Sequence, residues 1–445
     1  MPKPQAWRLK WLGIVGMLMM VVACLWWWAD SEDTRLQNTW NQVSLSMGWA
    51  SSPAMQWRLD FTPQPADSQL ANTTDPEHLV RQIYAHLGEG ERAQALATAS
   101  VLVERFPTFQ LGQLLYADLL NISSAKPVAW PDNEELNAPS LRKRLDELIL
   151  ESKRRLQRDS AQSLQGKIPT ALTFLSPQQT YVAAVDASKS RLYWFENRSG
   201  PDGRLQLHLV KETYISVGIN GVGKHKEGDG KTPLGVYFIL RNLPGEGLPD
   251  LFGVGALTLN YPNAVDLMRK KTGSGIWLHG TPSAQYARAP ESTDGCVVLS
   301  NPDLERLLET VQVRTTPVVI APSLQWVKPD ALAGDLAQFE AVLASWRQTR
   351  GAGNLDELKT FYSQRFMSQG RDLAQWWPRV ETELRANGSR ELQMKDLSVL
   401  RWRDQEDTMV VTFGEVATGQ TRGVTKRQYW VREQDRWTIF FEGTI

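Results

Sequence analysis

The sequence predicts a multidomain protein in which an N-terminal transmembrane helix and a short all-α region precede a mainly-β sandwich and a C-terminal α+β domain. Three observations predict this class. A run of 19 residues without a charge lies near the N-terminus, short strand patterns separated by Gly, Pro and Asp fill residues 178–321, and helical patterns precede strand patterns after residue 330. A chain of 445 residues is also too long for a single core.

The uncharged run covers residues 11–29, and a helix of this length, at about 1.5 Å per residue, nearly crosses a hydrocarbon core of about 30 Å. Basic residues precede it and acidic residues follow it, so residues 1–10 are expected to form a cytoplasmic n-region. This predicts a single-pass inner-membrane protein whose chain after residue 30 is periplasmic. The alternative is a lipoprotein, because residues 21–24 resemble a lipobox and Cys24 would then carry the lipid.

Residues 30–74 are expected to form a linker, because they lack sustained periodicity and are rich in Pro, Ser, Thr and Gln from residue 51 onward. Residues 75–165 are predicted to be helical, with one tetratricopeptide-like hairpin and a charged helix at 140–158. A single hairpin cannot bury both of its faces, so it must pack on neighbours or on an envelope protein partner.

Composition excludes several classes of function. Lys plus Arg and Asp plus Glu both number 49, so the formal net charge is zero and a nucleic-acid partner is not expected. The two cysteines are Cys24 and Cys296, and the first lies in the apolar run. A disulfide and a thiolate zinc cluster are therefore not expected, and the sequence predicts no metal site and no cofactor.

The strand patterns of the central region are RLYWF, RLQLHLV, TYISVG, GVYFIL, GALTLN, IWLHG, CVVLS and PVVIA. One helix is expected among them, with Asn301 as its N-cap and Pro302 at its first position. After Pro329, two helices over residues 336–346 and 358–366 precede four strands. Four aromatic residues of the last strands are expected in the core of this domain: Trp430, Trp437, Phe440 and Phe441.

The chemistry is concentrated around His279, which precedes Cys296 by 17 residues. A thiolate attacks an acyl carbon, so a working cysteine needs a neighbour that takes its proton, and histidine suits this role near neutral pH. Among five histidines, His279 ends an apolar strand beside a glycine. Gly295 lets backbone approach a substrate, and the amides of Gly295 and Cys296 are predicted to face a developing oxyanion.

These residues resemble the YkuD family of L,D-transpeptidases, in which a histidine, a spacer and a Ser/Thr-x-Gly-Cys box follow one another. Upstream, Thr232, Pro233 and Gly235 resemble the family's Thr-Pro-x-Gly strand. The resemblance implies an L,D-transpeptidase catalytic domain over residues 175–322, with a YkuD-type sandwich. It implies that Cys296 is the nucleophile, that His279 is the general base and acid, and that substrate contacts involve Gly280, Thr293, Asp294 and Lys231.

One position departs from the family pattern, because many members have His or Arg where this chain has Asp294. An acidic residue removes a positive charge beside the nucleophile, so stabilisation of the thiolate is expected to depend more on His279. Lys224, Lys226 and Lys231 form a basic stretch that can steer an acidic stem peptide, although such loops are usually only solvated.

The resemblance implies that Cys296 attacks the L-centre carbonyl of a peptidoglycan tetrapeptide stem, expels D-Ala and passes the acyl group to an amine. With water as acceptor the enzyme would be an L,D-carboxypeptidase, and lipoprotein attachment or cleavage at the same stem residue is a third activity. A non-catalytic envelope scaffold is the rival from a different class. The acceptor cannot be read from the dyad.

Residues 330–445 resemble the cone-shaped nuclear-transport-factor-2-like domains. They contain no His and no Cys, so they are expected to supply neither member of the dyad. Such domains bind ligands, dimerise or support a neighbour. A chain cut near Pro329 is therefore expected to keep a reactive Cys296, while binding to the cell wall or to an envelope partner weakens.

Overall fold

The structure is a computed structural model that describes residues 75–123, 139–159, 161–199, 205–387, 390–420 and 423–445. The expected n-region, membrane anchor and linker lie outside these residues. Within the described part of the chain, no helix is long and apolar enough to cross a membrane. The chain divides into two compact units, Met1–Ile149 and Leu150–Ile445, and the boundary falls inside helix α5 (Pro139–Leu156).

The first unit contains the expected hairpin, formed by α2 (Pro76–Gly88) and α3 (Arg92–Arg105). Asp75 caps α2, because its side chain accepts a 3.0 Å hydrogen bond from the Glu77 amide. A third helix that the sequence analysis did not identify, α4 (Gln110–Ser123), packs on α3 and buries a row of leucines. The apolar face of the hairpin therefore has a neighbour within the chain.

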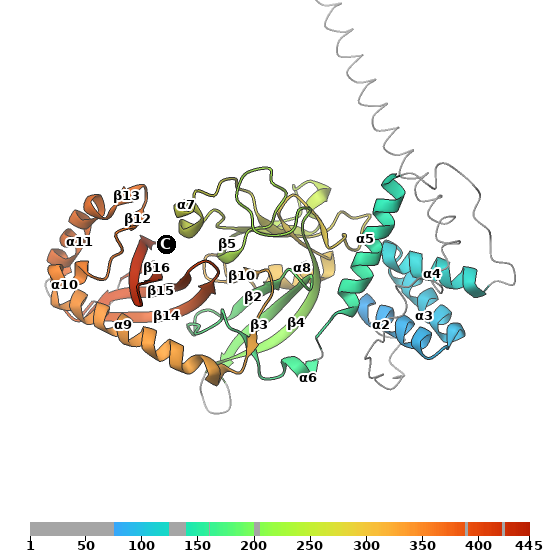
Figure 1. Ribbon diagram of the computed structural model, residues 1–445, viewed down its shortest axis with the longest axis horizontal. Helices are drawn as coiled ribbons and strands as arrows, with labels where there is room; N and C mark the ends of the chain where they lie inside the picture. Colours follow the sequence, from blue (N-terminus) through green and yellow to red (C-terminus); the bar gives the residue numbers. More distant parts are fainter. Residues whose placement is uncertain (1–74, 124–138, 160, 200–204, 388–389, 421–422) are drawn as a thin grey trace, which may run out of the picture. The chain divides into compact units, whose positions relative to one another are not determined.

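The second unit begins with the end of α5 and α6 (Ala161–Leu164), followed by a β-domain (Figure 1). Apolar residues alternate or run continuously along its strands, which suits a sheet with one or both faces buried. The main sheet consists of β2 (Tyr181–Asp186), β3 (Arg191–Ser199), β4 (Leu205–Gly218), β5 (Gly235–Pro244), β6 (Gly255–Leu259), β7 (Trp277–His279), β8 (Glu291–Thr293), β9 (Val297–Leu299) and β10 (Pro317–Ala321).

The strand order is β3-β2-β10-β5-β6-β7-β9-β4-β8, and β3 also pairs with β4, so the sheet closes on itself. This confirms the mainly-β class and shows a barrel-like ring. Two strands expected separately, RLQLHLV and TYISVG, form the single long strand β4, which pairs with β3 and then with β9. The ring encloses a core that includes Leu192, Ile215, Tyr237, Leu278 and Val297.

Helices and one short pair of strands, β1 with β11, lie outside the main sheet in this region. The expected N-cap of the helix after β9 is wrong, because Ser300 caps α8 (Asn301–Thr310) by accepting from the Asp303 amide, and Asn301 is the first helical residue. The side chain of Asn301 is used elsewhere, as described below. The remaining elements of this region are β1 (Ile168–Pro169), η5 (Asp250–Phe252), α7 (Ala264–Met268), β11 (Trp326–Val327) and η6 (Pro329–Leu332).

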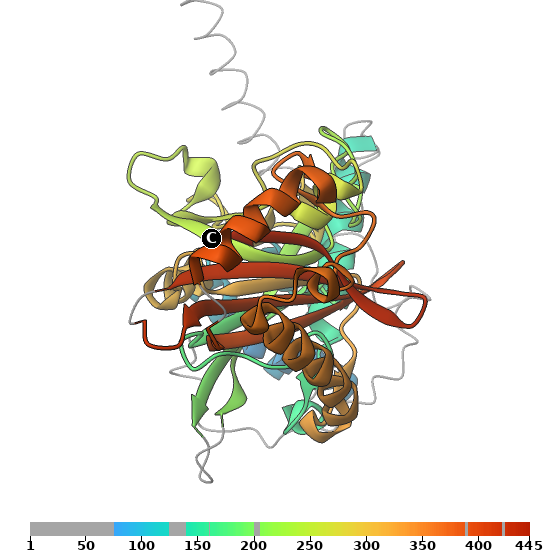
Figure 2. The ribbon, with the colours of Figure 1, turned by 90° about the vertical axis from the view of Figure 1, so that its left-hand side faces the viewer.

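The C-terminal domain places helices on one face of an antiparallel sheet, with strand order β14-β15-β16-β17 (Figure 2). The second helix was expected over residues 358–366, but α10 covers Leu355–Lys359 and is shorter. The helix α11 was not expected, since Pro378 inside it is a helix-breaking signal. The elements are α9 (Ala333–Ala352), α10 (Leu355–Lys359), β12 (Met367–Ser368), β13 (Arg371–Asp372), α11 (Leu373–Asn387), β14 (Leu392–Arg403), β15 (Asp407–Ala417), β16 (Val424–Glu433) and β17 (Arg436–Thr444).

Both faces of this C-terminal sheet are buried. One face packs against α9, α10 and α11, and Trp430 and Trp437 lie there. The other face packs against the β-domain, and Phe440 and Phe441 lie on that side, so only half of the aromatic cluster belongs to the expected core. Tyr429 pairs with Phe441 and Trp430 with Ile439, so Phe440 is the extra residue of a β-bulge, and the interrupted alternation lets Phe440 and Phe441 lie on the same side.

A single apolar cluster joins the β-domain and the C-terminal domain. It combines strand residues of the ring with strand residues of the C-terminal sheet, and we call it the shared core. Figure 2 shows the helices in front, the C-terminal sheet behind them and the strands of the ring behind that sheet. Its fully or almost fully buried members include Val182, Tyr193, Phe195, Phe238 and Val319 from the ring, and Leu400, Val410, Tyr429, Val431 and Phe440 from the C-terminal sheet.

Candidate active site

The ring brings together His279, the last residue of β7, and Cys296, the residue before β9. Strands β7 and β9 are parallel neighbours, with Leu278 opposite Val297. Both of these residues point into the core of the ring. Side chains alternate along a strand, so His279 and Cys296, each one residue away, lie on the opposite face. The fold thus places on one surface two residues that the sequence separates by 17 positions.

The imidazole of His279 is held in one orientation. It is 3% exposed, and its Nδ1 lies 2.8 Å from the carbonyl oxygen of Gly280. A carbonyl only accepts, so Nδ1 carries the proton and Nε2 is left as the basic nitrogen. Burial lowers the pKa of His279 to about 4, and the nearby charge of Arg288 acts in the same direction. The imidazole of His279 is therefore neutral and can accept a proton at neutral pH.

The thiol of Cys296 is half-buried, and Sγ donates to the carbonyl oxygen of Gly275 at 3.5 Å. Burial raises the pKa of the Cys296 thiol, and the carboxylate of Asp294 adds to this rise. A hydrogen bond from the Trp277 backbone and the positive charges of Arg288 and Lys224 stabilise the thiolate, so they act to lower this pKa. The resting site is thus a neutral thiol beside a neutral imidazole, and the proton moves when the substrate is attacked.

This resting state predicts the pH dependence of thiol reactivity. Iodoacetamide reacts with the thiolate, so its rate at Cys296 should rise about tenfold per pH unit from pH 6 and should continue to rise at pH 9. Peptide mass spectrometry at Cys296 over this range measures it. A rate that is already constant between pH 5 and pH 8 would indicate a thiolate–imidazolium pair and would contradict this description.

The turn before Cys296 is fixed by Thr293. Its Oγ1 accepts from the Gly295 amide at 3.1 Å and donates to the Cys296 carbonyl oxygen at 2.7 Å. Gly295 has φ +126°, and a Cβ there would lie 2.7 Å from the Lys231 carbonyl oxygen, so only glycine fits. The Gly295 amide must release Thr293 before it can bind an oxyanion. Its proposed oxyanion role, and that of the Cys296 amide, stay predictions.

Asn301 holds the loop that follows His279, and the sequence analysis missed this role. Its Oδ1 accepts from the amides of Val254 and Thr281, at 3.2 and 3.1 Å, and its Nδ2 donates to the Thr281 carbonyl oxygen at 2.9 Å. A Cβ on Gly280 would lie 2.1 Å from Asn301 Oδ1, so this glycine is required by packing. An Asn-Pro pair at a helix start looks like a cap, and no sequence signal pointed to the loop.

The basic loop before β5 is organised by Asp229. Its carboxylate accepts from the amides of His225, Lys226 and Lys231, and it pairs with Lys224 Nζ at 2.8 Å. Lys224 is buried by this pair, Lys226 is exposed, and Lys231 is half-buried. Of the proposed substrate-binding residues, Asp294 is exposed at the surface beside Cys296. Contacts of Gly280, Thr293, Asp294 and Lys231 with a substrate stay predictions.

Arg288, on the loop between His279 and Cys296, was also missed. Its carbonyl oxygen accepts from Tyr214 Oη and Ser216 Oγ, both at 2.9 Å, and its guanidinium donates to the Ser292 carbonyl oxygen at 2.7 Å. Its charge favours both a neutral His279 and a thiolate at Cys296. A lone arginine in a loop carries no signal of such a position.

In the described part of the chain, one group of side chains can bring three metal ligands together. Ligand atoms of His86, Glu89 and Glu91 lie within 4.8 Å of one another, in the first unit. This group is partly exposed and does not belong to the β-domain. The sequence-based expectation of a metal-free site therefore stays a prediction.

Comparisons with known proteins agree with this geometry. Residues 180–320 match the family model of the L,D-transpeptidase catalytic domain, YkuD, and residues 338–443 match that of the Cds6 C-terminal NTF2-like domain. A comparison with curated proteins finds no match. Both domain types that the sequence resembled are thus present.

Two solved structures are each similar to 62% of the chain. Bd1075 from Bdellovibrio bacteriovorus is 25% identical, with a TM-score of 0.52, over 62% of this chain and 98% of that chain. The helical cell shape determining protein Pgp2 from Campylobacter jejuni is 21% identical, with a TM-score of 0.50, over 62% of this chain and 95% of that chain. The likeness to Pgp2 supports the fold alone.

Proposed function

We propose that this chain, which carries a YkuD L,D-transpeptidase catalytic domain followed by an NTF2-like domain, is a cysteine acyltransferase of peptidoglycan stem peptides. The observation that carries the proposal is the orientation of His279 at the end of β7, on the same surface as Cys296, which immediately precedes β9. The Nδ1 proton is held by Gly280, which leaves Nε2 as the base. Neither residue needs a metal or cofactor for the chemistry that follows.

The reaction proceeds in two steps. Nε2 of His279 takes the proton from the Cys296 thiol as sulfur attacks the L-centre carbonyl of a tetrapeptide stem. The carbon–nitrogen bond to D-Ala then breaks, the imidazolium returns the proton to the leaving amine, and a thioester remains on Cys296. An amine acceptor attacks the thioester and gives a proton to His279, the carbon–sulfur bond breaks, and the imidazolium returns the proton to sulfur, which restores the Cys296 thiol. We propose an amine as the acceptor, because the matching family model is that of an L,D-transpeptidase catalytic domain.

Products of the full-length protein with tetrapeptide muropeptides test the activity. Mass spectrometry should show release of D-Ala together with cross-linked products that contain the acceptor amine. Release of D-Ala with only shortened tripeptides would identify an L,D-carboxypeptidase, and transfer to or from a lipoprotein lysine would identify the third activity. A folded protein that neither releases D-Ala nor attaches or cleaves a lipoprotein would leave a non-catalytic envelope scaffold.

The proposed location is the inner membrane, with a single-pass anchor at residues 11–29 and the enzyme in the periplasm. The charges on either side of the anchor support this orientation, and a lipid on Cys24 is the alternative. A reporter fused after Ile445 should be active only if it requires the periplasm. Activity of a cytoplasm-only reporter at this position would reverse the topology and separate the enzyme from its substrate.

Partners other than the stem peptides are also a proposal. The helical hairpin and the C-terminal domain offer surfaces for an envelope protein, while the zero net charge gives no support to a nucleic-acid partner. The protein Pgp2, which has a similar fold, is described as determining helical cell shape. We propose a role in cell-wall shape for this chain as well.

A further inference from the structure

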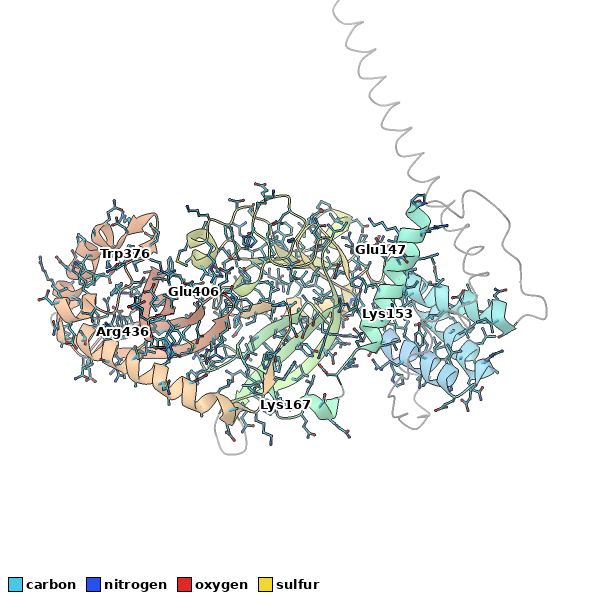
Figure 3. All side chains as sticks on the ribbon, viewed as in Figure 1. Glu147, Lys153, Lys167, Trp376, Glu406 and Arg436 are labelled. Carbon is cyan, nitrogen blue, oxygen red and sulfur yellow. The ribbon has the colours of Figure 1, made fainter. Side chains whose placement is uncertain are left out.

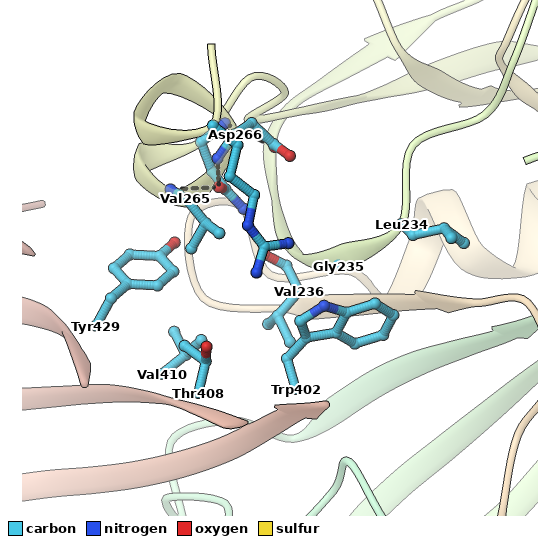
Figure 4. A pocket seen from close by; sticks show the side chains of 11 residues that line it. Leu234, Gly235, Val236, Val265, Asp266, Trp402, Thr408, Val410 and Tyr429 are labelled. Atoms are coloured by element: carbon cyan, nitrogen blue, oxygen red, sulfur yellow. Dashed lines mark hydrogen bonds between the residues drawn. The ribbon is translucent and has the colours of Figure 1, made fainter. Parts of the chain in front are cut away.

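Residues 264–276, which comprise α7 and the chain that leads into β7, form a segment that starts at the contact with the C-terminal domain. Helix α7 contributes Val265 to the shared core, and Met268 packs against it. Arg269 follows as the C-cap of α7. Figure 4 shows Val265 and Asp266 facing Trp402, Tyr429 and Val410 of the C-terminal sheet across a small pocket. The segment is therefore attached to the C-terminal domain at this end.

Arg269 makes a two-pronged contact with the turn between β14 and β15. Its Nη1 and Nη2 lie 2.6 and 3.0 Å from the two carboxylate oxygens of Asp404, and Nη2 lies 3.6 Å from Glu406. Figure 3 shows Glu406 at the margin of the C-terminal sheet. Bidentate pairs of this kind fix orientation as well as distance.

The ion pair between Arg269 and Asp404, which we call the clamp, is shielded from solvent more than an ordinary surface pair. The side chain of Arg269 is 17% exposed and that of Asp404 is 29% exposed. Burial acts to raise the pKa of Asp404, but hydrogen bonds from Arg269 and Trp402 hold it below its ordinary value. Glu406 in turn pairs with Arg365 at 2.8 Å, which supports the turn from inside the C-terminal domain.

The other end of the same segment contacts Cys296 and leads into the strand that carries His279. The carbonyl oxygen of Gly275 accepts from the Cys296 thiol at 3.5 Å, and the segment continues directly into β7, which ends at His279. Between these ends, the Thr272 amide donates to the His225 carbonyl oxygen at 3.0 Å. The ion pair of Lys271 with Asp266, at 2.9 Å, fixes the local shape of the segment but does not attach it to the C-terminal domain.

We infer that the C-terminal domain positions the catalytic dyad through the clamp between Arg269 and Asp404, which makes Arg269 a positioning residue. The inference rests on the proposed function, because it takes Cys296 and His279 as the working pair. The C-terminal domain supplies no reacting atom, yet it holds the segment on which Gly275 and His279 depend. A displacement of about 1 Å in such a site can cost about a hundredfold in rate.

The test uses the full-length protein and two reagents that make different demands on the site. Acylation of Cys296 by a carbapenem β-lactam needs an aligned base and an oxyanion site, whereas alkylation by iodoacetamide needs only an accessible thiolate. Arg269→Met should lower the acylation rate about tenfold and leave alkylation within about twofold. Arg269→Lys, which keeps the charge, should recover much of the loss.

Arg403→Met is the matched control, because Arg403 is an exposed arginine on β14 that pairs with Asp335 and Asp407 inside the C-terminal domain. It should change neither rate. If Arg269→Met does not fold, Asp404→Asn removes the same clamp from the other side and should give the same loss. Acylation in the folded clamp variant equal to that of Arg403→Met would overturn the inference alone. A wild-type protein that neither acylates nor releases D-Ala would overturn the proposed function and the inference together.

Discussion

Cys296→Ala is expected to abolish D-Ala release from tetrapeptide stems, and His279→Ala to lower it by about two to four orders of magnitude. The first change removes the sulfur that forms the thioester. The second removes Nε2, the nitrogen that the hydrogen bond to Gly280 leaves free to accept a proton. Release of D-Ala by the purified variants, measured under conditions that saturate the wild type, gives both values.

Matched controls exist for both changes. Cys24→Ala removes the other cysteine, and His208→Ala removes a half-buried histidine on β4. Both control variants should keep turnover close to that of the wild type. Turnover in folded Cys296→Ala above the level without enzyme would mean that another group is the nucleophile.

Removal of the C-terminal domain is expected to prevent the catalytic domain from folding. A chain that ends at residue 329 would expose one face of the ring, including Tyr193, Phe195 and Phe238, which are fully buried in the intact protein. An apolar patch of this kind on a free domain leads to aggregation. The shortened protein should be insoluble or should lose cooperative unfolding in urea, and its Cys296 should lose acylation by a carbapenem.

A single substitution tests the same point within the intact chain. Phe440 is 1% exposed in the shared core, so Phe440→Ala should lower the free energy of unfolding by about 3–5 kcal/mol. Val424→Ala, at a 46% exposed position of β16, should change it by less than about 0.5 kcal/mol. A soluble chain that ends at residue 329, unfolds cooperatively and is acylated normally would show that the catalytic domain folds without the C-terminal domain, as the sequence predicted.

The dyad could be predicted from the sequence because its evidence is local. His279 ends an apolar strand, Cys296 follows a glycine, and each feature is visible in a few residues. Strands β14 to β17 were found for the same reason, since their apolar alternation is regular. The single span of β4 could not be found, because a bulge within a strand leaves no mark in a pattern of hydrophobicity.

The residues that support the dyad could not be predicted because they act through the fold. Asn301 contacts Val254 and Thr281 through its side chain, and Arg269 contacts Asp404, which lies 135 residues away. Polar side chains at such distances give no periodic signal. The shared core was hidden for a related reason, because Phe440 and Trp430 look equally apolar in sequence while the sheet sends them to opposite faces.

Mass spectrometry of the acid-quenched full-length protein, after brief incubation with tetrapeptide muropeptide, measures whether Cys296 forms a thioester with the stem peptide. We expect an adduct on the Cys296 peptide with the mass of the stem without D-Ala, and hydroxylamine should remove it. No adduct in the wild type, together with undiminished D-Ala release by folded Cys296→Ala, would contradict the thioester mechanism.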